Sequence, residues 1–224
     1  MHPIETRAAA EFDRWAEAGR ADTMADGHRD VTGQLLDRWT LTSEHHLLDV
    51  GCGNGWAVRC ALERGAGEGS GVDVSPAMID QARRGPGHFT KSRAADLPFA
   101  DATFTHVLSV ESLYYYPDPG AALAEWARVT APGGHLGVVI DLYQESPGTH
   151  AWPDAFGFPV HLLGADRYRQ LAEAAGWREV QTFRLHDRRP GKDPDSFIPS
   201  PYWPSFEHYL RFREDGSLAI TGRR

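Results

Sequence analysis

The hydrophobic positions in the first forty residues recur at helical spacing. Apolar residues three or four positions apart predict an amphipathic helix over 4–19. The polar stretch 20–28 then predicts a loop. Val31 and Leu35 lie on one face of a second expected helix, over 29–39. The sequence therefore predicts a helical segment ahead of the remaining elements.

Short apolar runs and helical patterns alternate after this segment. The run 46–50 is closed by glycines, which is typical of a buried strand in a parallel sheet. Ser75-Pro76 and Asp118-Pro119 each offer a helix cap followed by a proline at the first helical position. Strands are expected at 46–50, 69–74, 89–95, 105–110, 135–142, 178–185 and 217–224. Helices are expected at 56–65, 76–84, 119–131 and 166–176, the last capped by Asp166, and a turn at 214–216 should lead into the final strand.

This alternation predicts an α/β fold, a parallel sheet with helices on both faces. Residues 187–206 are rich in proline, aspartate and arginine and are expected to form an insertion between the last two strands. In open sheets of this kind, ligands bind at the carboxyl ends of the strands, where the strand order reverses. Residues directly after the strands are therefore the first candidates for a site.

Composition limits the classes of partner. The chain has 224 residues and a formal net charge of −8, which suits one globular domain and disfavours nucleic acids and anionic membranes. The N-terminus lacks the apolar region of a secretory signal, and the apolar runs are short for a bilayer. Cys52 and Cys60 match neither a disulfide framework nor a metal pair. We expect a cytoplasmic protein without a bound metal.

The candidate site begins with the loop that follows the first strand. Residues 49–55 read D-V-G-C-G-N-G, and the glycines permit unusual backbone angles and close approach of a ligand. The spacing differs from the G-x-G-x-x-G of dinucleotide enzymes. Asp73, at the end of the second strand, can accept hydrogen bonds from both ribose hydroxyls. Asp96, after the third strand, can accept one from an adenine amino group.

The chain at this point resembles a known family. The segments LLDVGCGNG, GVDVSPAMI, AADLPFADATF, HVLSVESLYYYPDP and RVTAPGGHL occur in the order and spacing of class I S-adenosylmethionine (SAM)-dependent methyltransferases. The resemblance is strongest to the branch that methylates small molecules and quinone precursors. It covers residues 44–141 well and the rest of the chain by element order alone.

The resemblance implies a Rossmann-like, doubly wound sheet of seven strands, mostly parallel with an antiparallel last strand. It implies a single methyltransferase domain over 1–224. Within that domain, 1–40 would be an N-terminal helical cap, 44–141 the SAM-binding core, and 142–224 a C-terminal half with inserts on the substrate side.

It also implies a set of SAM-binding residues. Asp49 would order the loop near the methionine ammonium group, Asp73 would hold the ribose, and Asp96 would bind the adenine amino group. Val74 and Met78 would flank the adenine. The full implied set is Asp49, Gly51, Cys52, Gly53, Gly55, Asp73, Val74, Met78, Ala95, Asp96, Leu97 and Ser109.

The chemistry itself needs few groups, because the methyl of SAM is already activated and catalysis can rest on positioning and exclusion of water. If the acceptor must lose a proton, Glu111 and Tyr114 are the leading candidates, ahead of His150 and His161. A structural salt bridge is the alternative role of Glu111, and packing is the alternative role of the tyrosines. Residues expected against the substrate are Tyr115, Trp15 and Trp203.

We therefore predict a SAM-dependent methyltransferase that acts on an O, N, S or C atom of a small molecule. The sequence lacks the Asn/Asp-Pro-Pro-Tyr/Phe motif of enzymes that methylate amines of nucleic-acid bases. Two alternatives stay open: a SAM-binding protein without catalysis, and an NAD-dependent oxidoreductase. The acceptor lies beyond what the sequence predicts, as does the oligomeric state.

Overall fold

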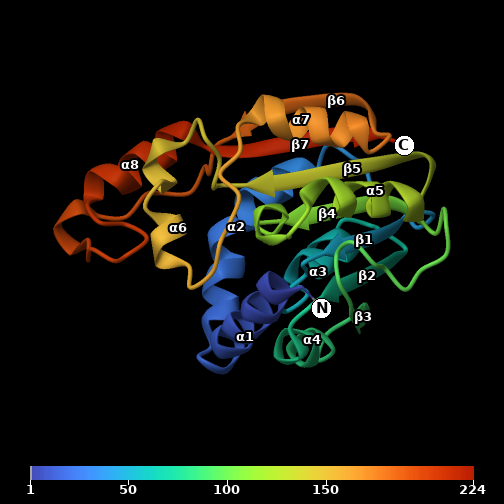
Figure 1. Ribbon diagram of the computed structural model, residues 1–224, viewed down its shortest axis with the longest axis horizontal. Helices are drawn as coiled ribbons and strands as arrows, with labels where there is room; N and C mark the ends of the chain where they lie inside the picture. Colours follow the sequence, from blue (N-terminus) through green and yellow to red (C-terminus); the bar gives the residue numbers. More distant parts are fainter. Residues whose placement is uncertain (1) are drawn as a thin grey trace.

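The computed structural model describes residues 2–224 and has a seven-stranded sheet at its centre (Figure 1). The strands are β1 (His46–Val50), β2 (Glu68–Asp73), β3 (His88–Lys91), β4 (Phe104–Val110), β5 (Thr130–Ile140), β6 (Arg178–Leu185) and β7 (Ser217–Arg223). Their order is β3-β2-β1-β4-β5-β7-β6. The first five strands pair in parallel, and β7 is antiparallel to both β5 and β6. The expected doubly wound sheet with an antiparallel last strand is confirmed.

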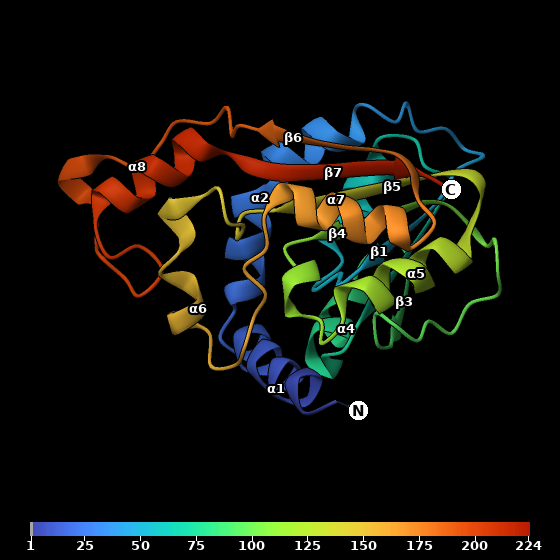
Figure 2. The ribbon, with the colours of Figure 1, turned by 45° about the horizontal axis from the view of Figure 1, so that its top comes forward.

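Helices cover both faces of this sheet. They are α1 (Pro3–Glu17), α2 (Arg20–Leu36), α3 (Trp56–Glu63), α4 (Pro76–Ala82), α5 (Pro119–Val129), α6 (Trp152–Ala155), α7 (Ala165–Ala174) and α8 (Phe206–Asp215). Short 3-10 turns are η1 (Leu113–Tyr115), η2 (Pro147–Thr149) and η3 (Pro194–Ser196). Figure 2 shows α5 and α7 in front of the sheet and α2 behind it.

The alternation of side chains along the strands explains this layering. Leu48 and Val138 belong to the core cluster on the α5 and α7 side. Leu47 and Val139, their neighbours in sequence, belong to the cluster with α2 and α3. Successive residues of a strand point to opposite faces, so an apolar run without polar interruptions needs cover on both sides.

Residues 20–28 form the first half of α2, so the prediction of a loop there is wrong. Only Ala18 and Gly19 separate α1 from α2, and Gly19 makes the turn with a φ of 70°. Ala21 and Ala25, four residues apart, are buried and supply a narrow apolar face. Because alanine is only weakly hydrophobic and the rest of the stretch is polar, the helical spacing does not stand out in the pattern of hydrophobic residues.

Other elements differ in their limits. β3 ends at Lys91, so Ala95 lies beyond it and not within it. β5 starts at Thr130, ahead of the predicted start, because Thr130 already pairs with Phe104 of β4, although the register shifts before His135. The Gly133 amide within this irregular stretch donates to the carbonyl of Arg224. In α7 the N-cap is Gly164, where Asp166 had been expected.

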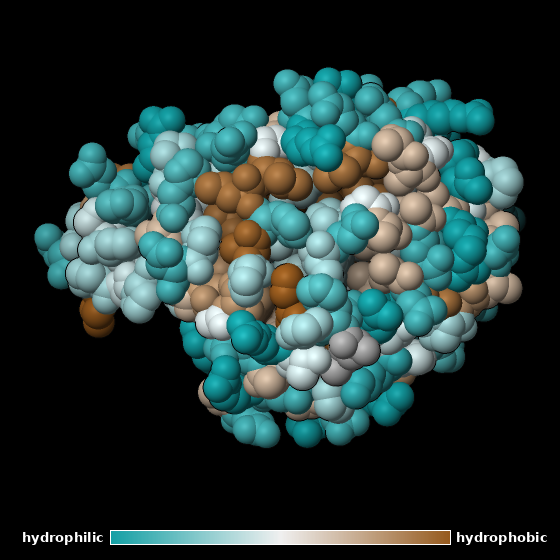
Figure 3. Space-filling view, viewed as in Figure 1, coloured by the Kyte–Doolittle hydropathy of each residue, from teal (hydrophilic) through white to brown (hydrophobic). Residues whose placement is uncertain are grey.

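A helix, α8, occupies the stretch where only a turn at 214–216 was predicted. The hydroxyl of Ser205 accepts a hydrogen bond from the His208 amide and caps its first turn. Together with α6, α8 extends past the carboxyl ends of the strands (Figure 1). On the side of the molecule seen in Figure 1, apolar residues reach the surface mainly near the connection from α6 to α7 (Figure 3). Among residues 2–224, no helix combines the length and the apolarity that a membrane crossing requires.

Substitution of Gly55 tests how closely the loop after β1 is packed against its neighbours. Its φ is 79°, and an added Cβ would lie 2.6 Å from Cζ of Phe89, whereas Gly133 has a φ of 80° and open space around it. Gly133→Ala should therefore lower the free energy of unfolding by about 1 kcal/mol, the cost of a left-handed alanine. Gly55→Ala should cost about 2–4 kcal/mol, because overpacking adds to that cost. Urea denaturation measures both, and equal losses would contradict the crowding.

Candidate active site

The carboxyl ends of the five parallel strands form one continuous edge. Because the strand order is known, the segments after the strands follow one another in space along that edge. They are Ser92–Ala94 after β3, Asp73–Val74 at the end of β2, Gly51–Asn54 after β1, Glu111 after β4 and Asp141 after β5.

The loop after β1 is folded back against the end of β2. The amide of Gly51 donates to the carbonyl of Val72 at 2.8 Å, and the amide of Gly53 donates to Oδ2 of Asp73 at 2.9 Å. An added Cβ on Gly51 would lie 2.5 Å from Cβ of Ser112, but one on Gly53 would meet only Sδ of Met78, at 3.9 Å. The backbone at Gly53 therefore leaves room for a ligand.

Asp73 is held on both of its carboxylate oxygens by backbone amides. Asp73 is 8% exposed, and its second oxygen, Oδ1, accepts a hydrogen bond from the Ser75 amide at 2.8 Å. Burial raises the pKa of Asp73, while the amides of Ser75 and Gly53 oppose that rise. A carboxylate has about four acceptor positions, so two amide donors leave capacity for a ligand's hydroxyls.

Asp49 lies beneath the same loop. It is 2% exposed, and its Oδ1 has no hydrogen-bond partner within residues 2–224. Burial, and then the charge of Asp73, raise the pKa of Asp49 to about 8. An unpaired buried carboxyl is costly, and a nearby positive charge would relieve that cost.

A cavity, termed the inner cavity, runs along the edge from Ser92–Ala94 to Glu111. Of the residues predicted to bind the cofactor, its walls include Gly51, Cys52, Gly53, Asp73, Val74 and Met78. Cys52 is buried, and burial raises the pKa of its thiol, which agrees with a filler and not a nucleophile.

The remaining predicted residues lie outside these walls, and their assigned roles stay predictions. Gly55 is covered by the Phe89 ring, as noted above. Ser109 is buried and shares a 2.6 Å hydrogen bond with Ser112. Asp49, Ala95, Asp96 and Leu97 are also absent from the walls. The side chain of Asp96 is exposed to solvent, and the Leu97 amide donates to Glu125.

A second, wider cavity, termed the outer cavity, has a volume of about 660 Å³. All the residues predicted to meet substrate lie in its walls, namely Tyr115, Trp15 and Trp203, and so do Glu111 and Tyr114. Trp152 and Phe156 add aromatic surface from the C-terminal half. The outer cavity is thus built from the N-terminal helices and the segments after β4, β5 and β6.

The two cavities share part of their walls. Met24, His28, Glu111 and Tyr115 line both of them. The shared wall therefore contains three ionisable groups, His28, Glu111 and Tyr115, at the place where the two cavities adjoin. Groups placed there can act on a ligand in either cavity.

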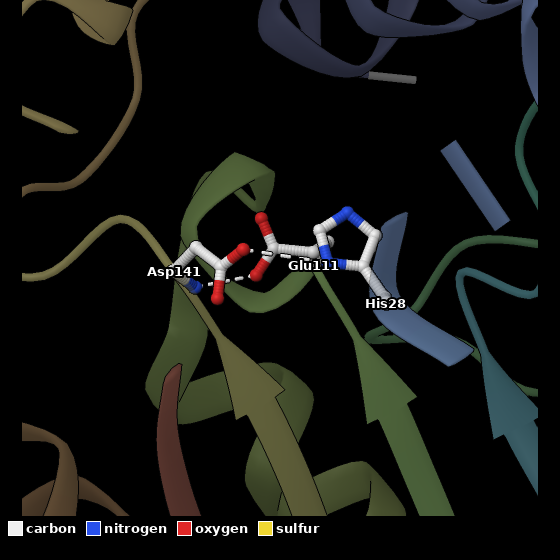
Figure 4. Close-up of side chains that lie close together, drawn as sticks. All are labelled: His28, Glu111 and Asp141. Atoms are coloured by element: carbon white, nitrogen blue, oxygen red, sulfur yellow. Dashed lines mark hydrogen bonds and ion pairs between the residues drawn. The ribbon is translucent and has the colours of Figure 1, made fainter. Parts of the chain in front are cut away.

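His28, Glu111 and Asp141 converge at this wall from α2, β4 and β5 (Figure 4). Nδ1 of His28 lies 3.4 Å from Oδ2 of Asp141. Glu111 accepts hydrogen bonds on both oxygens, from the Asp141 amide and, at 2.7 Å, from the Tyr114 hydroxyl. Glu111 also has a φ of 51°, a strained conformation for a residue with a side chain. Such strain is concentrated at functional sites.

The electrostatics of this cluster are unusual. Burial disfavours a charged His28, but the hydrogen bond to Asp141 and the charges of both acids outweigh it and raise the pKa of His28 to about 9. Burial, followed by the charge of Asp141, raises the pKa of Glu111 to about 8. Burial also raises the pKa of Tyr114. The Tyr114 hydroxyl donates a hydrogen bond to Glu111 and keeps its proton, so it is a poor base.

Sequence reasoning missed His28 and Asp141. Asp141 could have been found, because it directly follows a parallel strand, at the edge where Asp73 ends another. His28 fell in the stretch predicted as a loop. The other histidines considered, His150 and His161, bond to the carbonyls of Gln144 and Tyr116 and line neither cavity.

Comparison with known proteins agrees with this geometry. Residues 48–138 match the family described as the methyltransferase domain. Methyltransferase GfsG of Streptomyces halstedii is 31% identical over 74% of this chain and 64% of its own length. O-methyltransferase resE of Aspergillus sclerotiorum is 29% identical over 77% of this chain and 70% of its own length. The chain thus spans about two thirds of these curated relatives.

A solved structure is similar over nearly its whole length. It is a chain from the complex between the Haloferax volcanii Trm112 methyltransferase activator and a candidate methyltransferase. The similarity has a TM-score of 0.85 and 31% identity, and covers 95% of this chain and 97% of that one. With the seven-stranded fold and the glycine loop in place, the chain belongs to the class I SAM-dependent methyltransferases, enzymes whose methyl donor is S-adenosylmethionine.

Proposed function

We propose that this protein transfers the methyl group of SAM, bound in the inner cavity, to a hydroxyl oxygen of a small molecule bound in the outer cavity. The observation that carries the proposal is the shared wall, where His28 and Glu111 face both cavities. The names of two relatives, O-methyltransferases resE and cnsE, each 29% identical to this chain, support an oxygen acceptor.

The inner cavity suits SAM in the chemistry of its walls. The open backbone at Gly53 would accommodate the methionine portion, and Asp73 would accept hydrogen bonds from the ribose hydroxyls. The unpartnered oxygen of Asp49 favours a cationic ligand nearby. Bound SAM supplies a methyl group activated by the positive charge of its sulfonium. The part of the cavity next to Glu111 is then where the acceptor and the methyl group would meet.

The outer cavity suits a small organic acceptor. Its volume lies within the range of about 300–1,000 Å³ that is usual for ligand pockets. Aromatic rings form much of its wall, and one of them, Tyr115, packs edge to face against Phe12 of the inner cavity. Such walls exclude water from the acceptor. The two thiols, Cys52 and Cys60, are free, which fits a reducing compartment, and we propose cytoplasmic action.

His28 would take the proton of the acceptor hydroxyl. Its Nδ1 is directed at Asp141, and Figure 4 shows the second ring nitrogen turned away from both carboxylates. Asp141 would stabilise the imidazolium that forms. Glu111, held by Tyr114 and by the Asp141 amide, adds a second negative charge beside it. Proton uptake of this kind accelerates a reaction by about 10²–10⁴-fold.

The same three side chains also have metal-ligand spacing, with one candidate ligand atom of each within 4.8 Å of the others. Both oxygens of Glu111 already accept hydrogen bonds from the protein, and Asp141 is paired with His28. These contacts favour a role of the cluster in proton transfer over a role in metal binding.

Turnover should therefore be insensitive to EDTA, and a loss of activity that Mg²⁺ restores would contradict the proposed role of His28.

Asp73 should dominate cofactor affinity. Asp73→Ala removes a charge-assisted hydrogen bond of about 1.5–3 kcal/mol, so we expect SAM to bind roughly tenfold to a hundredfold more weakly. Asp80→Ala is the matched control, because Asp80 is an exposed acid in the next helix and forms only a surface pair with Arg83. Calorimetric titration measures both, and an unchanged affinity for Asp73→Ala would refute the assignment.

His28→Gln should reduce the turnover number by about a hundredfold or more, at saturating SAM and with a hydroxylated acceptor found by screening. His150→Gln is the control, since that histidine lines neither cavity. Release of S-adenosylhomocysteine reports the rate. If both variants turn over like the natural protein, His28 is not the proton acceptor.

The pH dependence follows from the direction of the His28 shift. The base is the neutral imidazole, and its pKa of about 9 means that the neutral fraction increases as pH rises from 7 towards 9. The rate constant kcat/KM for the acceptor should therefore rise over this range and level off above it. In His28→Gln the rise should be absent. A rise that persists in the variant would assign the titration to another group.

A further inference from the structure

The inner cavity has a defined direction. Its three acidic wall residues are Glu5, Asp73 and Glu111. The reacting end of a bound cofactor must lie beside Glu111, because only that end adjoins the outer cavity. With the ribose at Asp73, which ends β2, the base lies further along the same edge, towards β3. There the walls are Glu5, Met78 and the segment Ser92–Ala94.

Glu5 is built firmly into that end. It lies in the first turn of α1 and is 7% exposed. Nε of Arg93 donates to both of its carboxylate oxygens, at 3.0 and 2.9 Å, and the amide of His2 donates to Oε2 at 2.9 Å. The carboxylate is therefore fixed in place, and its donors do not use all of its acceptor positions, of which a carboxylate has about four.

An adenine presents an exocyclic amino group as a hydrogen-bond donor. Asp96, expected from the sequence to accept that bond, has an exposed side chain outside the cavity walls. At the β3 end of the cavity, Glu5 is the acidic residue in the walls. We propose that the Glu5 carboxylate accepts the hydrogen bond of the adenine amino group and so makes the site specific for an adenosine cofactor, with Arg93 as the residue that positions it.

This inference rests on the cofactor of the family and not on the proposed hydroxyl acceptor. A different role for the pair would be purely structural, an ion pair that holds α1 against the segment after β3. The two roles differ in one measurable respect. A structural pair affects the binding of every cofactor analogue equally, whereas a base-reading carboxylate affects only analogues that keep the amino group.

The test compares S-adenosylhomocysteine with S-inosylhomocysteine, in which an oxygen replaces the adenine amino group. Both are titrated calorimetrically into the whole protein, without any acceptor. The natural protein should bind the adenosine compound at least about tenfold more tightly, because the inosine oxygen would face a carboxylate. In Glu5→Gln, whose amide can donate to that oxygen, the ratio should fall to near one or reverse.

Asp96→Asn is the matched control, since it makes the same change at the exposed acid, and it should keep the natural ratio. Arg93→Met tests the positioning role and should lower the ratio, because the Glu5 carboxylate is still present but no longer held by Arg93. Thermal unfolding of each variant checks that it folds. A natural ratio in Glu5→Gln, including the case in which both compounds weaken equally, would overturn the proposal. Equal binding of the two compounds by the natural protein would also overturn it.

Discussion

The hydrogen bond from the Gly53 amide to Asp73 sets the geometry on which the site depends. It ties the loop after β1 to the end of β2, so two adjacent strands present their ends to one ligand. The positive φ angles of Gly51, Gly53 and Gly55 make that turn possible. The carboxylate also accepts the amide of Ser75, which caps α4, so the loop, the strand end and the helix start share one anchor.

The buried carboxylates along this edge differ in the groups that stabilise them. Glu5 is paired with Arg93, Asp73 is bonded to amides, and Glu111 lies within a cluster that includes His28. Asp49 and Asp141 each have one buried oxygen, Oδ1, without a hydrogen-bond partner within residues 2–224. Burial raises the pKa of Asp49 and Glu111 to about 8, so a cationic ligand stabilises their charged forms. The cavity thus favours a positively charged cofactor before any base or sugar is recognised.

The fold could be predicted because its signals are local. Apolar runs closed by glycines mark the parallel strands, and serine or aspartate followed by proline marks the starts of α4 and α5. Of the predicted site, the residues at the strand ends and in the first loop, such as Gly53 and Asp73, lie on the inner cavity.

What the sequence could not predict depends on contacts between distant elements. His28 lies on α2, whose first half has an apolar face made of alanines, and it meets Asp141 only through packing of α2 beside β5. Asp96 follows β3 closely in sequence, but its side chain is exposed to solvent outside the cavity walls, while Glu5 reaches the cavity from the far end of the chain. Proximity along the chain therefore led to Asp96, whereas the cavity wall at that strand end contains Glu5, the acid that we propose binds the base.

A crystal structure with S-adenosylhomocysteine bound would test the central claim most directly, because it shows both the occupant and the direction of the inner cavity. The account predicts the ribose hydroxyls on Asp73, the adenine between Met78 and Ser92–Ala94, and the sulfur at the wall shared with the outer cavity, beside Glu111. An adenine at the Glu111 end, or binding outside the inner cavity, would contradict it.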